Sequence, residues 1–235
     1  MNKVLSLFFL FCALTSFGQS FDWGISLHPN FSNRRLIAIG NFSEQDIVTI
    51  DSMETARPSY SCGVFANWQS EKIGLYLGLN YMSTGYRSIK NFILPDDPLS
   101  QNYTYQRFVY QNKNIEIPIV LQFIQRPNDK NAIYFNLGTA LSYNLQNTEK
   151  SIFYSGESKT NGETIILDGD NFRKVNFAFQ TGMGWKRSFE SGLAITLEPV
   201  FVMWIKGILK DGELNRSIYS LGLRTSISLG GYDMY

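Results

Sequence analysis

The chain has 235 residues, a formal net charge of +1 and 17% charged residues. This length suits one large all-β domain or two small domains, and the low, balanced charge argues against a nucleic-acid-binding surface. Aromatic residues make up 15% of the sequence and glycine occurs 19 times, a mixture that is typical of twisted strands and of interfaces that favour Tyr and Trp.

The first residues have the pattern of a secretory signal peptide. Lys3 supplies the positive charge, and Val4–Thr15 forms an apolar run that is too short to span a membrane as a helix. Ser16 and Gly18 put small residues at the two positions that a signal peptidase reads. We therefore expect cleavage after Gly18, which makes residues 1–18 a signal peptide.

The mature domain is then residues 19–235. A lipoprotein signal at Cys12 is the alternative, but Phe11 stands where a small residue is needed and Cys12 comes too early. Cys62 is left as the only cysteine, so no internal disulfide forms, and we interpret it as a small apolar strand residue. The mature domain has no second apolar run long enough for a membrane helix, so an integral contact with a membrane would require a closed β-barrel.

Eight segments of the mature domain alternate between large apolar side chains and small or polar ones, as strands with two different faces do. They are Phe21–Leu27, Tyr60–Trp68, Ile73–Tyr81, Asn114–Phe123, Ala132–Leu145, Val175–Trp185, Leu193–Phe201 and Ser217–Leu229. The clearest is Asn114–Phe123. Its apolar face is Ile115, Ile117, Ile119, Leu121 and Phe123, and its other face is Glu116, Pro118, Val120 and Gln122.

The connections between these segments alternate in length. We expect long polar connections at Asn30–Arg57, Gly85–Arg107 and Gln146–Lys174, with short turns between them, and we expect Pro29 to end the first strand. Met203–Leu214 is a connection of moderate length. Apolar residues within the long connections predict ordered hairpin extensions, or near Ile47 a strand extension or cap. They are Ile47, Val48, Ile50, Phe92, Ile93, Leu94, Ile152, Phe153, Ile165, Ile166 and Leu167.

The composition of the second faces indicates which side of the sheet is apolar. These faces hold Gly, Ser, Ala, Asn and Gln together with Glu116, Glu198 and Arg224. A soluble barrel of the lipocalin type needs apolar side chains or a ligand inside, whereas a small barrel in lipid packs a polar lumen. The sequence therefore predicts an all-β fold: an eight-stranded antiparallel up-and-down transmembrane β-barrel with long extracellular loops and short periplasmic turns.

Aromatic residues stand near the ends of the predicted strands. Trp23, Trp68 and Trp185 lie on the apolar face beside the short turns, which predicts an aromatic girdle at the periplasmic interface. An opposite girdle is expected from Tyr60, Tyr81, Tyr110, Tyr143, Tyr219 and Trp204.

Three stretches resemble a known family. Asn114–Phe123 resembles the Leu-Glu-Ile-Pro-Leu strand of the PorT-like outer-membrane β-barrel family. Tyr134–Gly138 and Ser220–Arg224 extend the resemblance over essentially the whole mature chain. The residues that carry the strand motif are Ile115, Glu116, Ile117 and Pro118.

The resemblance implies an eight-stranded barrel that is exported to the outer membrane. The member that gives this family its name is an accessory of a secretion system coupled to gliding motility, and most members have no assigned activity. The chain departs from the family after Leu229, because Gly230–Tyr235 follow the last strand where members often end on an aromatic residue.

Glu116, Glu198 and Arg224 are the candidate lumen charges. If the short-turn ends of the last two strands align, Glu198 lies opposite Arg224. A buried carboxylate without a partner is costly, so we expect a structural ion pair that plugs the lumen. A path for protons or solutes is the alternative interpretation of the same residues.

Other candidate chemistry is sparse. His28 is the only histidine and could serve as a general base, but no nucleophile motif accompanies it, so we expect no enzyme. The pairs Asp96–Asp97 and Asp168/Asp170 could bind calcium, although solvated loop charge is the simpler interpretation. Asp51–Met53 resembles a bacterial O-glycosylation acceptor.

The predicted function is that of an integral outer-membrane protein of the Gram-negative type. We expect a monomer in contact with outer-membrane lipid, without cofactor, metal or nucleic acid, that acts as a structural, interaction or accessory component. A protein partner would bind through the surface loops or on the periplasmic side. The alternative is a membrane-embedded enzyme or a narrow channel at the barrel rim.

Overall fold

The computed structural model describes residues 20–38, 40–167, 169 and 171–230. The predicted signal peptide, and the position of Tyr235 relative to the last strand, lie outside the described residues.

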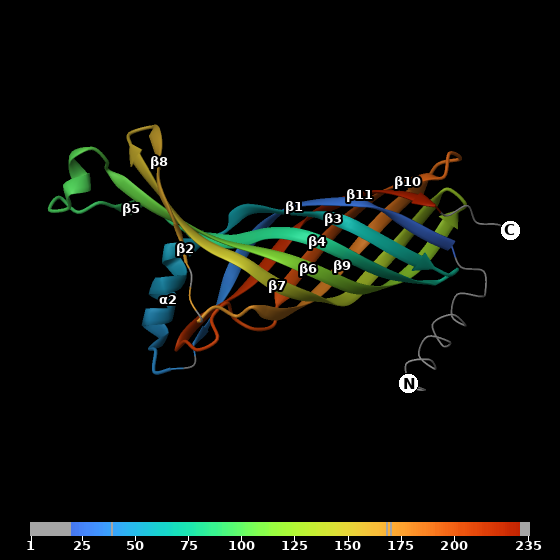
Figure 1. The fold of residues 1–235 in the computed structure, drawn as a ribbon, viewed down its shortest axis with the longest axis horizontal. Coiled ribbons are helices and arrows are strands. Elements are labelled where there is room, and N and C mark those ends of the chain that lie inside the picture. Colours follow the sequence, from blue (N-terminus) through green and yellow to red (C-terminus); the bar gives the residue numbers. More distant parts are fainter. Residues whose placement is uncertain (1–19, 39, 168, 170, 231–235) are drawn as a thin grey trace.

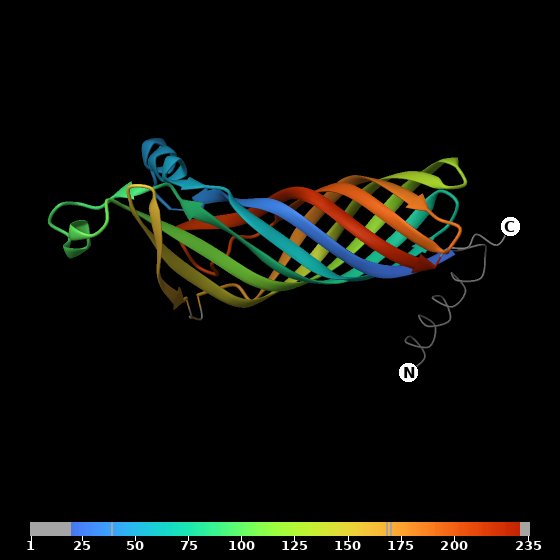
Figure 2. The same cartoon turned by 90° about the horizontal axis from the view of Figure 1, so that it is seen from above.

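Within this part of the chain, eight long strands close into an antiparallel ring, as predicted. The ring order is β4-β3-β1-β11-β10-β9-β7-β6, and β6 pairs back onto β4 to close it (Figures 1 and 2). The strands are β1 (Ser20–Ala38), β3 (Arg57–Gln69), β4 (Ile73–Ser88), β6 (Tyr105–Asn128), β7 (Asn131–Ser155), β9 (Val175–Ser188), β10 (Leu193–Trp204) and β11 (Leu214–Gly230).

The two ends of the barrel differ. At the turn end, short connections join β3 to β4, β6 to β7 and β9 to β10. The loop end carries the remaining elements, which rise beyond the ring on the left of Figure 1. These elements are helix α2 (Glu44–Met53), β2 (Glu54–Thr55), β5 (Asn91–Phe92), the 3₁₀ helix η1 (Pro98–Gln101) and β8 (Ser158–Ile166). No helix among the described residues is long and apolar enough to span a membrane.

The first strand is longer than predicted. Pro29 does not end it: β1 runs on to Ala38, and Pro29 stands opposite Tyr60 of β3. The register of β1 with its other neighbour, β11, has no pairs at His28 and Pro29. This gap accommodates a residue that has no N–H to donate.

The prediction of a hairpin or strand around Ile47 is wrong, because residues 44–53 form α2. Its start is a reciprocal cap. The Ser43 hydroxyl accepts from the Asp46 backbone N–H at 3.1 Å, and the Asp46 carboxylate accepts from the Ser43 backbone N–H at 3.2 Å. Such a pair satisfies two of the free donors of a first turn. The other extensions are ordered hairpins as predicted: β7 turns at Gly156 into β8.

The barrel is apolar outside and polar inside. Along β6, Ile119 is 50% exposed on the outer face, whereas its neighbour Val120 is fully buried in the lumen. Glu116 and Gln122 are buried beside Val120, and Cys62 is a free cysteine exposed on the outer face. This inversion is the arrangement of a small barrel in lipid.

Small inward residues make room for large ones inside the ring. Tyr134 of β7 faces Gly184 of β9 in register. A Cβ atom built on Gly184 would stand 2.2 Å from Cζ of the Tyr134 ring, so only glycine fits there. An eight-stranded ring is just wide enough for interior side chains, so each large one needs a small neighbour.

Two aromatic residues lie on the side opposite to the predicted one. Trp204 and Tyr110, assigned to an outer girdle, both point inward. Trp204 is 4% exposed, and Tyr110 stacks on Tyr86 with ring centroids 4.7 Å apart. Strand alternation explains the error, because even-numbered residues of β6 and β10 face the lumen, as Glu116 and Glu198 do.

An apolar layer therefore crosses the lumen toward the loop end, inside a barrel whose lumen is otherwise mostly polar. It consists of Tyr86, Ala140, Ala178, Val200, Val202, Trp204 and Ile218, with Tyr110 and Ile208 packed against it.

We predict that replacing Ser43 with alanine loosens α2 alone. Loss of an N-cap costs a helix about 1 kcal/mol, which raises amide exchange in residues 44–53 roughly fivefold. Hydrogen-exchange mass spectrometry of the protein in detergent measures this. Thr49→Ala is the matched control, because the Thr49 hydroxyl bonds the Gln45 carbonyl rather than a free N–H. Equal exchange in the two variants would contradict the capping role.

We predict that low pH also loosens α2. Hydrogen bonds from the Ser43 side chain and backbone hold the pKa of the Asp46 carboxyl below its usual range. The unfolded segment would bind a proton near the ordinary value of about 3.9, so the stabilisation of α2 is complete above it. It is lost as the pH falls through the lowered pKa, and the protection of residues 44–53 should fall with it. Ser43→Ala should weaken that dependence, because only the backbone N–H of residue 43 would then still donate to the Asp46 carboxylate.

Candidate functional sites in the lumen and at its two ends

Glu198 and Arg224 form an ion pair in the middle of the lumen. They are direct register partners on β10 and β11, with 3.6 Å between Oε2 and Nη1, and both side chains are 3% exposed. Asn136 donates its amide to Glu198 at 2.5 Å. With its oxygen turned toward the guanidinium, the Gln180 amide accepts from Arg224 at 3.0 Å. The Arg224 guanidinium also lies 5.4 Å from the ring centroid of Tyr76.

Glu116 lies in the same lumen but outside this pair. Asn80 and Ser142 face it in register from β4 and β7. Among the described residues it makes no ion pair, and its Oε2 has no hydrogen-bond partner. Of the other residues of the strand motif, Ile115 and Ile117 face outward, and Pro118 is fully buried.

A second buried ion pair, which sequence reasoning missed, joins Lys186 and Asp22 near the turn end. The Lys186 ammonium donates to the Asp22 carboxylate, and the Gln69 amide oxygen lies 3.5 Å from the same nitrogen. The sequence held a signal for it. The predicted strand ended at Trp185, although the alternation, continued by one residue, turns Lys186 into the lumen toward the inward Asp22.

A charge network ties α2 to the loop end of the barrel. Glu54 accepts from Arg34 at 2.5 Å and from Arg216 at 2.7 Å. Arg34 also pairs with Asp51 at 2.6 Å and donates to the Ile50 and Asp51 carbonyls at the end of α2. Sequence reasoning missed this network because Arg34, Asp51 and Glu54 all lie in the first long connection, whereas Arg216 lies 162 positions after Glu54.

The three tryptophans assigned to the turn-end girdle lie on the outer wall. Trp23 and Trp185 are exposed there, and Trp68 packs on Phe21 with ring centroids 5.2 Å apart. Toward the loop end, Tyr60 and Tyr143 are exposed on the outer wall, Tyr81 lies 6.4 Å from Tyr60, and Tyr219 lies 6.3 Å from Phe201 between ring centroids.

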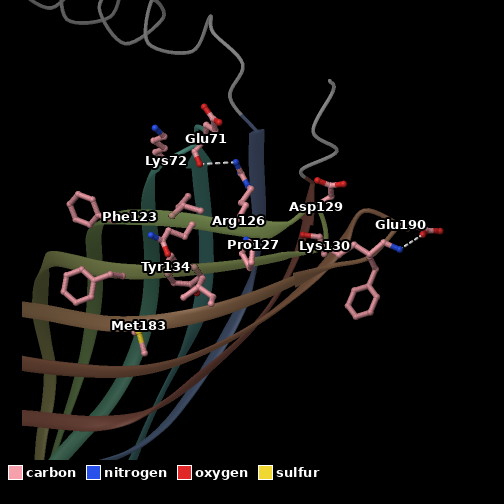
Figure 3. A pocket seen from close by; sticks show the side chains of 16 residues that line it. Glu71, Lys72, Phe123, Arg126, Pro127, Asp129, Lys130, Tyr134, Met183 and Glu190 are labelled. Atoms are coloured by element: carbon pink, nitrogen blue, oxygen red, sulfur yellow. Dashed lines mark hydrogen bonds and ion pairs between the residues drawn. The ribbon is translucent and has the colours of Figure 1, made fainter.

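Figure 3 shows a groove at the turn end, between β6, β7 and the neighbouring turns. It has a volume of about 1340 Å³ and combines apolar wall residues with charged turn residues. Arg126 donates to the Glu71 carbonyl at 3.2 Å, and Lys130 pairs with Glu190 at 2.8 Å (Figure 3). Phe123 and Met183 are exposed beside these charges. The groove is where the apolar band meets the charged turns, as at a membrane–water interface.

The residues considered as a general base, as calcium ligands and as a glycosylation site lie as follows. His28 is buried in the lumen and its Nε2 has no hydrogen-bond partner. The Asp97 carboxylate accepts from the Leu99 N–H at 2.9 Å and caps η1. Asp51–Met53 ends helix α2, and Asp168 and Asp170 lie outside the described residues. Among the described residues, no three His, Cys, Asp or Glu side chains gather closely enough to hold a metal ion.

Three solved structures resemble the chain in shape at low sequence identity. A major outer membrane protein from Thermus thermophilus has 10% identity and a TM-score of 0.46, with 91% of this chain and 99% of that chain covered. OprG from Pseudomonas aeruginosa has 9% identity and a TM-score of 0.44, with 91% and 94% covered. Neisserial surface protein A has 10% identity and a TM-score of 0.40, with 90% and 96% covered.

Comparison with curated protein sequences finds no match. A family model, described as the outer membrane protein beta-barrel domain, matches residues 17–203, which is most of the chain. The closed ring of eight strands, apolar outside and polar inside, agrees with that match. The chain therefore belongs to the outer membrane protein β-barrel family, and the outer membrane is its location.

Proposed function

We propose that the protein is an interaction or accessory component of the outer membrane, with a sealed barrel as its anchor and a structured extension as its working part. The observation that carries this proposal is the extension itself. Strands β6 and β7 continue beyond the ring as a paired ribbon that carries β5, η1 and β8 (Figure 1). Long connections with their own ordered structure usually carry function.

The extension is held by packed aromatic side chains. Tyr103 stacks on Phe153 with ring centroids 4.9 Å apart, and the Lys90 ammonium lies 4.2 Å from the Tyr154 ring centroid. Phe92 and Leu94 remain exposed, Leu94 by 65%. Exposed apolar side chains on a fixed scaffold are typical of a protein-binding surface.

The orientation proposed for the barrel puts the extension outside the cell. Cleavage after Gly18 would release the mature chain at the periplasmic side, and Trp23, Trp68 and Trp185 would form the periplasmic girdle at the turn end. The exposed apolar wall would contact outer-membrane lipid around a monomer. The resemblance to the PorT-like family supports an accessory role of this kind.

The lumen is proposed to be a plug rather than a path. The Asp22–Lys186 pair, the Glu198–Arg224 pair and the apolar layer fill it at successive levels. Glu116 then contributes to a packed polar interior. Neither a channel nor an enzyme at the rim is favoured, because His28 is buried within the lumen rather than placed at the rim.

We predict that Arg224→Met destabilises the barrel by about 3–5 kcal/mol, because it leaves the Glu198 carboxylate buried and without its cation. Urea unfolding in lipid vesicles, followed by tryptophan fluorescence, measures the change. The control is Lys130→Met, which breaks an exposed ion pair and should cost at most about 1 kcal/mol. Arg224→Met with Glu198→Leu should recover most of the loss. Equal costs for the two single variants would refute a plugging pair.

We predict that the pure protein in planar bilayers gives no steady single-channel currents, because side chains fill the ring at every level described above. Recordings that include an added porin serve as the positive control. Large, steady currents from the protein alone would favour the channel alternative.

The interaction proposal is tested by photo-crosslinking in intact cells. A crosslinking amino acid at Leu94 should capture a defined protein partner, whereas one at the equally apolar wall residue Ile25 should capture lipid. Phe92→Ser with Leu94→Ser should abolish the capture, and Val48→Ser on exposed α2 should leave it unchanged. If these variants have no effect on the capture while His28→Ala abolishes an activity on lipid, the interaction proposal is contradicted and an enzyme is favoured.

A further inference from the structure

A small cavity lies at the loop end of the barrel, between the charge network and the strand extension. Its volume is about 160 Å³. The lining residues come from β4, β6, β7, β11 and two loops, and several of them belong to the apolar layer or pack against it, so that layer borders the cavity. They are Tyr86, Tyr110, Gln111, Asn112, Asn147, Thr148, Leu167, Phe172, Ile208, Leu209 and Arg216.

One wall of the cavity is a rigid aromatic surface. Tyr86 and Tyr110 stack with an interplanar angle of 22°. The Arg216 guanidinium lies 5.5 Å from the Tyr86 ring centroid and is itself held by Glu54 through bonds of 2.7 and 3.1 Å. Stacked rings fixed by a paired guanidinium offer a preformed face to another flat ring.

Residues of two loops that bond to each other also line the cavity and form its cover. Phe172 and Leu209 form an isolated antiparallel bridge. The Lys210 N–H donates to the Asn171 carbonyl at 2.7 Å. The Asn215 side chain holds Leu209 by accepting from the Leu209 N–H at 3.0 Å and donating to the Leu209 carbonyl at 2.7 Å. These bonds hold the lining residues Phe172 and Leu209 in place, so the cavity exists before any ligand arrives.

Among the lining residues, one buried polar atom without a hydrogen-bond partner gives the cavity its preference for a ligand. Asn112 is 3% exposed and donates its amide to Asn147 at 2.5 Å. Its side-chain oxygen has no hydrogen-bond partner. A buried acceptor without a donor is costly, so a ligand that supplies one hydroxyl donor is favoured over one that supplies none.

The size of the cavity restricts the ligand to one ring. An apolar cavity of about 150 Å³ admits benzene, whereas drug-sized ligands need about 300 Å³ or more. A sugar ring would bring many hydroxyl groups to a lining that is mainly aromatic and aliphatic. We infer that this cavity binds a small phenolic molecule, with its ring against the Tyr86–Tyr110 pair and its hydroxyl donating to the Asn112 side-chain oxygen.

The test compares p-cresol, toluene and methyl α-glucoside by calorimetry on the pure full-length protein in detergent. We expect saturable binding of p-cresol, about tenfold weaker binding of toluene, and no binding of the glucoside. A tenfold ratio corresponds to about 1.4 kcal/mol, in the range of one hydrogen bond. Equal affinity for p-cresol and toluene, binding of the glucoside alone, or no binding at all would overturn it.

Two variants locate the site. Asn112→Leu, which is nearly isosteric, should bring p-cresol down to the affinity of toluene and leave toluene unchanged. Asn67→Leu is the matched control, because Asn67 is also buried in the lumen with an unpartnered side-chain oxygen but does not line this cavity. Leu209→Trp, in the cover, should fill the space and abolish the binding of both aromatic probes. If Asn67→Leu changes the ratio as much as Asn112→Leu, the site assignment is wrong.

Discussion

The requirement that every backbone N–H and C=O find a partner within the bilayer governs this structure. Hydrocarbon offers no hydrogen bonds, so a sheet that crosses it cannot have an open edge. The ring meets this requirement through one closure that the order of the chain does not supply by itself, the pairing of the first strand, β1, with the last, β11. Where β1 contains Pro29, the register with β11 has a gap at the residue that has no N–H.

Closure then decides what each face must contain. The outer face needs apolar side chains because it meets lipid, and the lumen of an eight-stranded ring has room only for side chains. Charges in such a lumen are far from water, and four of them form two pairs, Arg224 with Glu198 and Lys186 with Asp22, whereas Glu116 makes no ion pair among the described residues. Tyr134 fits because a glycine, Gly184, faces it. The polar interior is thus a packed core with reversed polarity, interrupted by the apolar layer toward the loop end and by a smaller cluster of Phe65, Tyr76 and Val120.

Much of the architecture could be predicted from two sequence patterns, the alternation of side chains along strands and the length of the turns. They predicted eight strands, their inward and outward faces, and the opposition of Glu198 and Arg224, because a side-chain period of two and a short turn set the register locally. The errors arose where local rules were not applied to the end of a strand. Trp204 and Lys186 both follow the alternation, but each lies beyond the predicted limit of its strand.

Other features depended on contacts that no local pattern encodes. The cap of α2 has a signature at Ser43 and Asp46, whereas the bond between Glu54 and Arg216 joins residues 162 positions apart. The cavity at the loop end combines β4, β6, β7 and β11 with two loops, so its lining appears only once the ring and its cover are assembled.

The pairing of β1 with β11 also governs how the chain can reach its native state. Trp23 pairs with Leu229, so the closing seam joins the first and the last strand of the ring. Contacts of such high sequence separation form slowly, because a long loop must first lose its conformational freedom. Until the last strand arrives, the preceding strands form an open sheet with an apolar face and two unpaired edges, a species prone to aggregate in water. The pairing of β1 with β11 removes both unpaired edges in one step, so the sheet loses its open edges only when the last strand is in place.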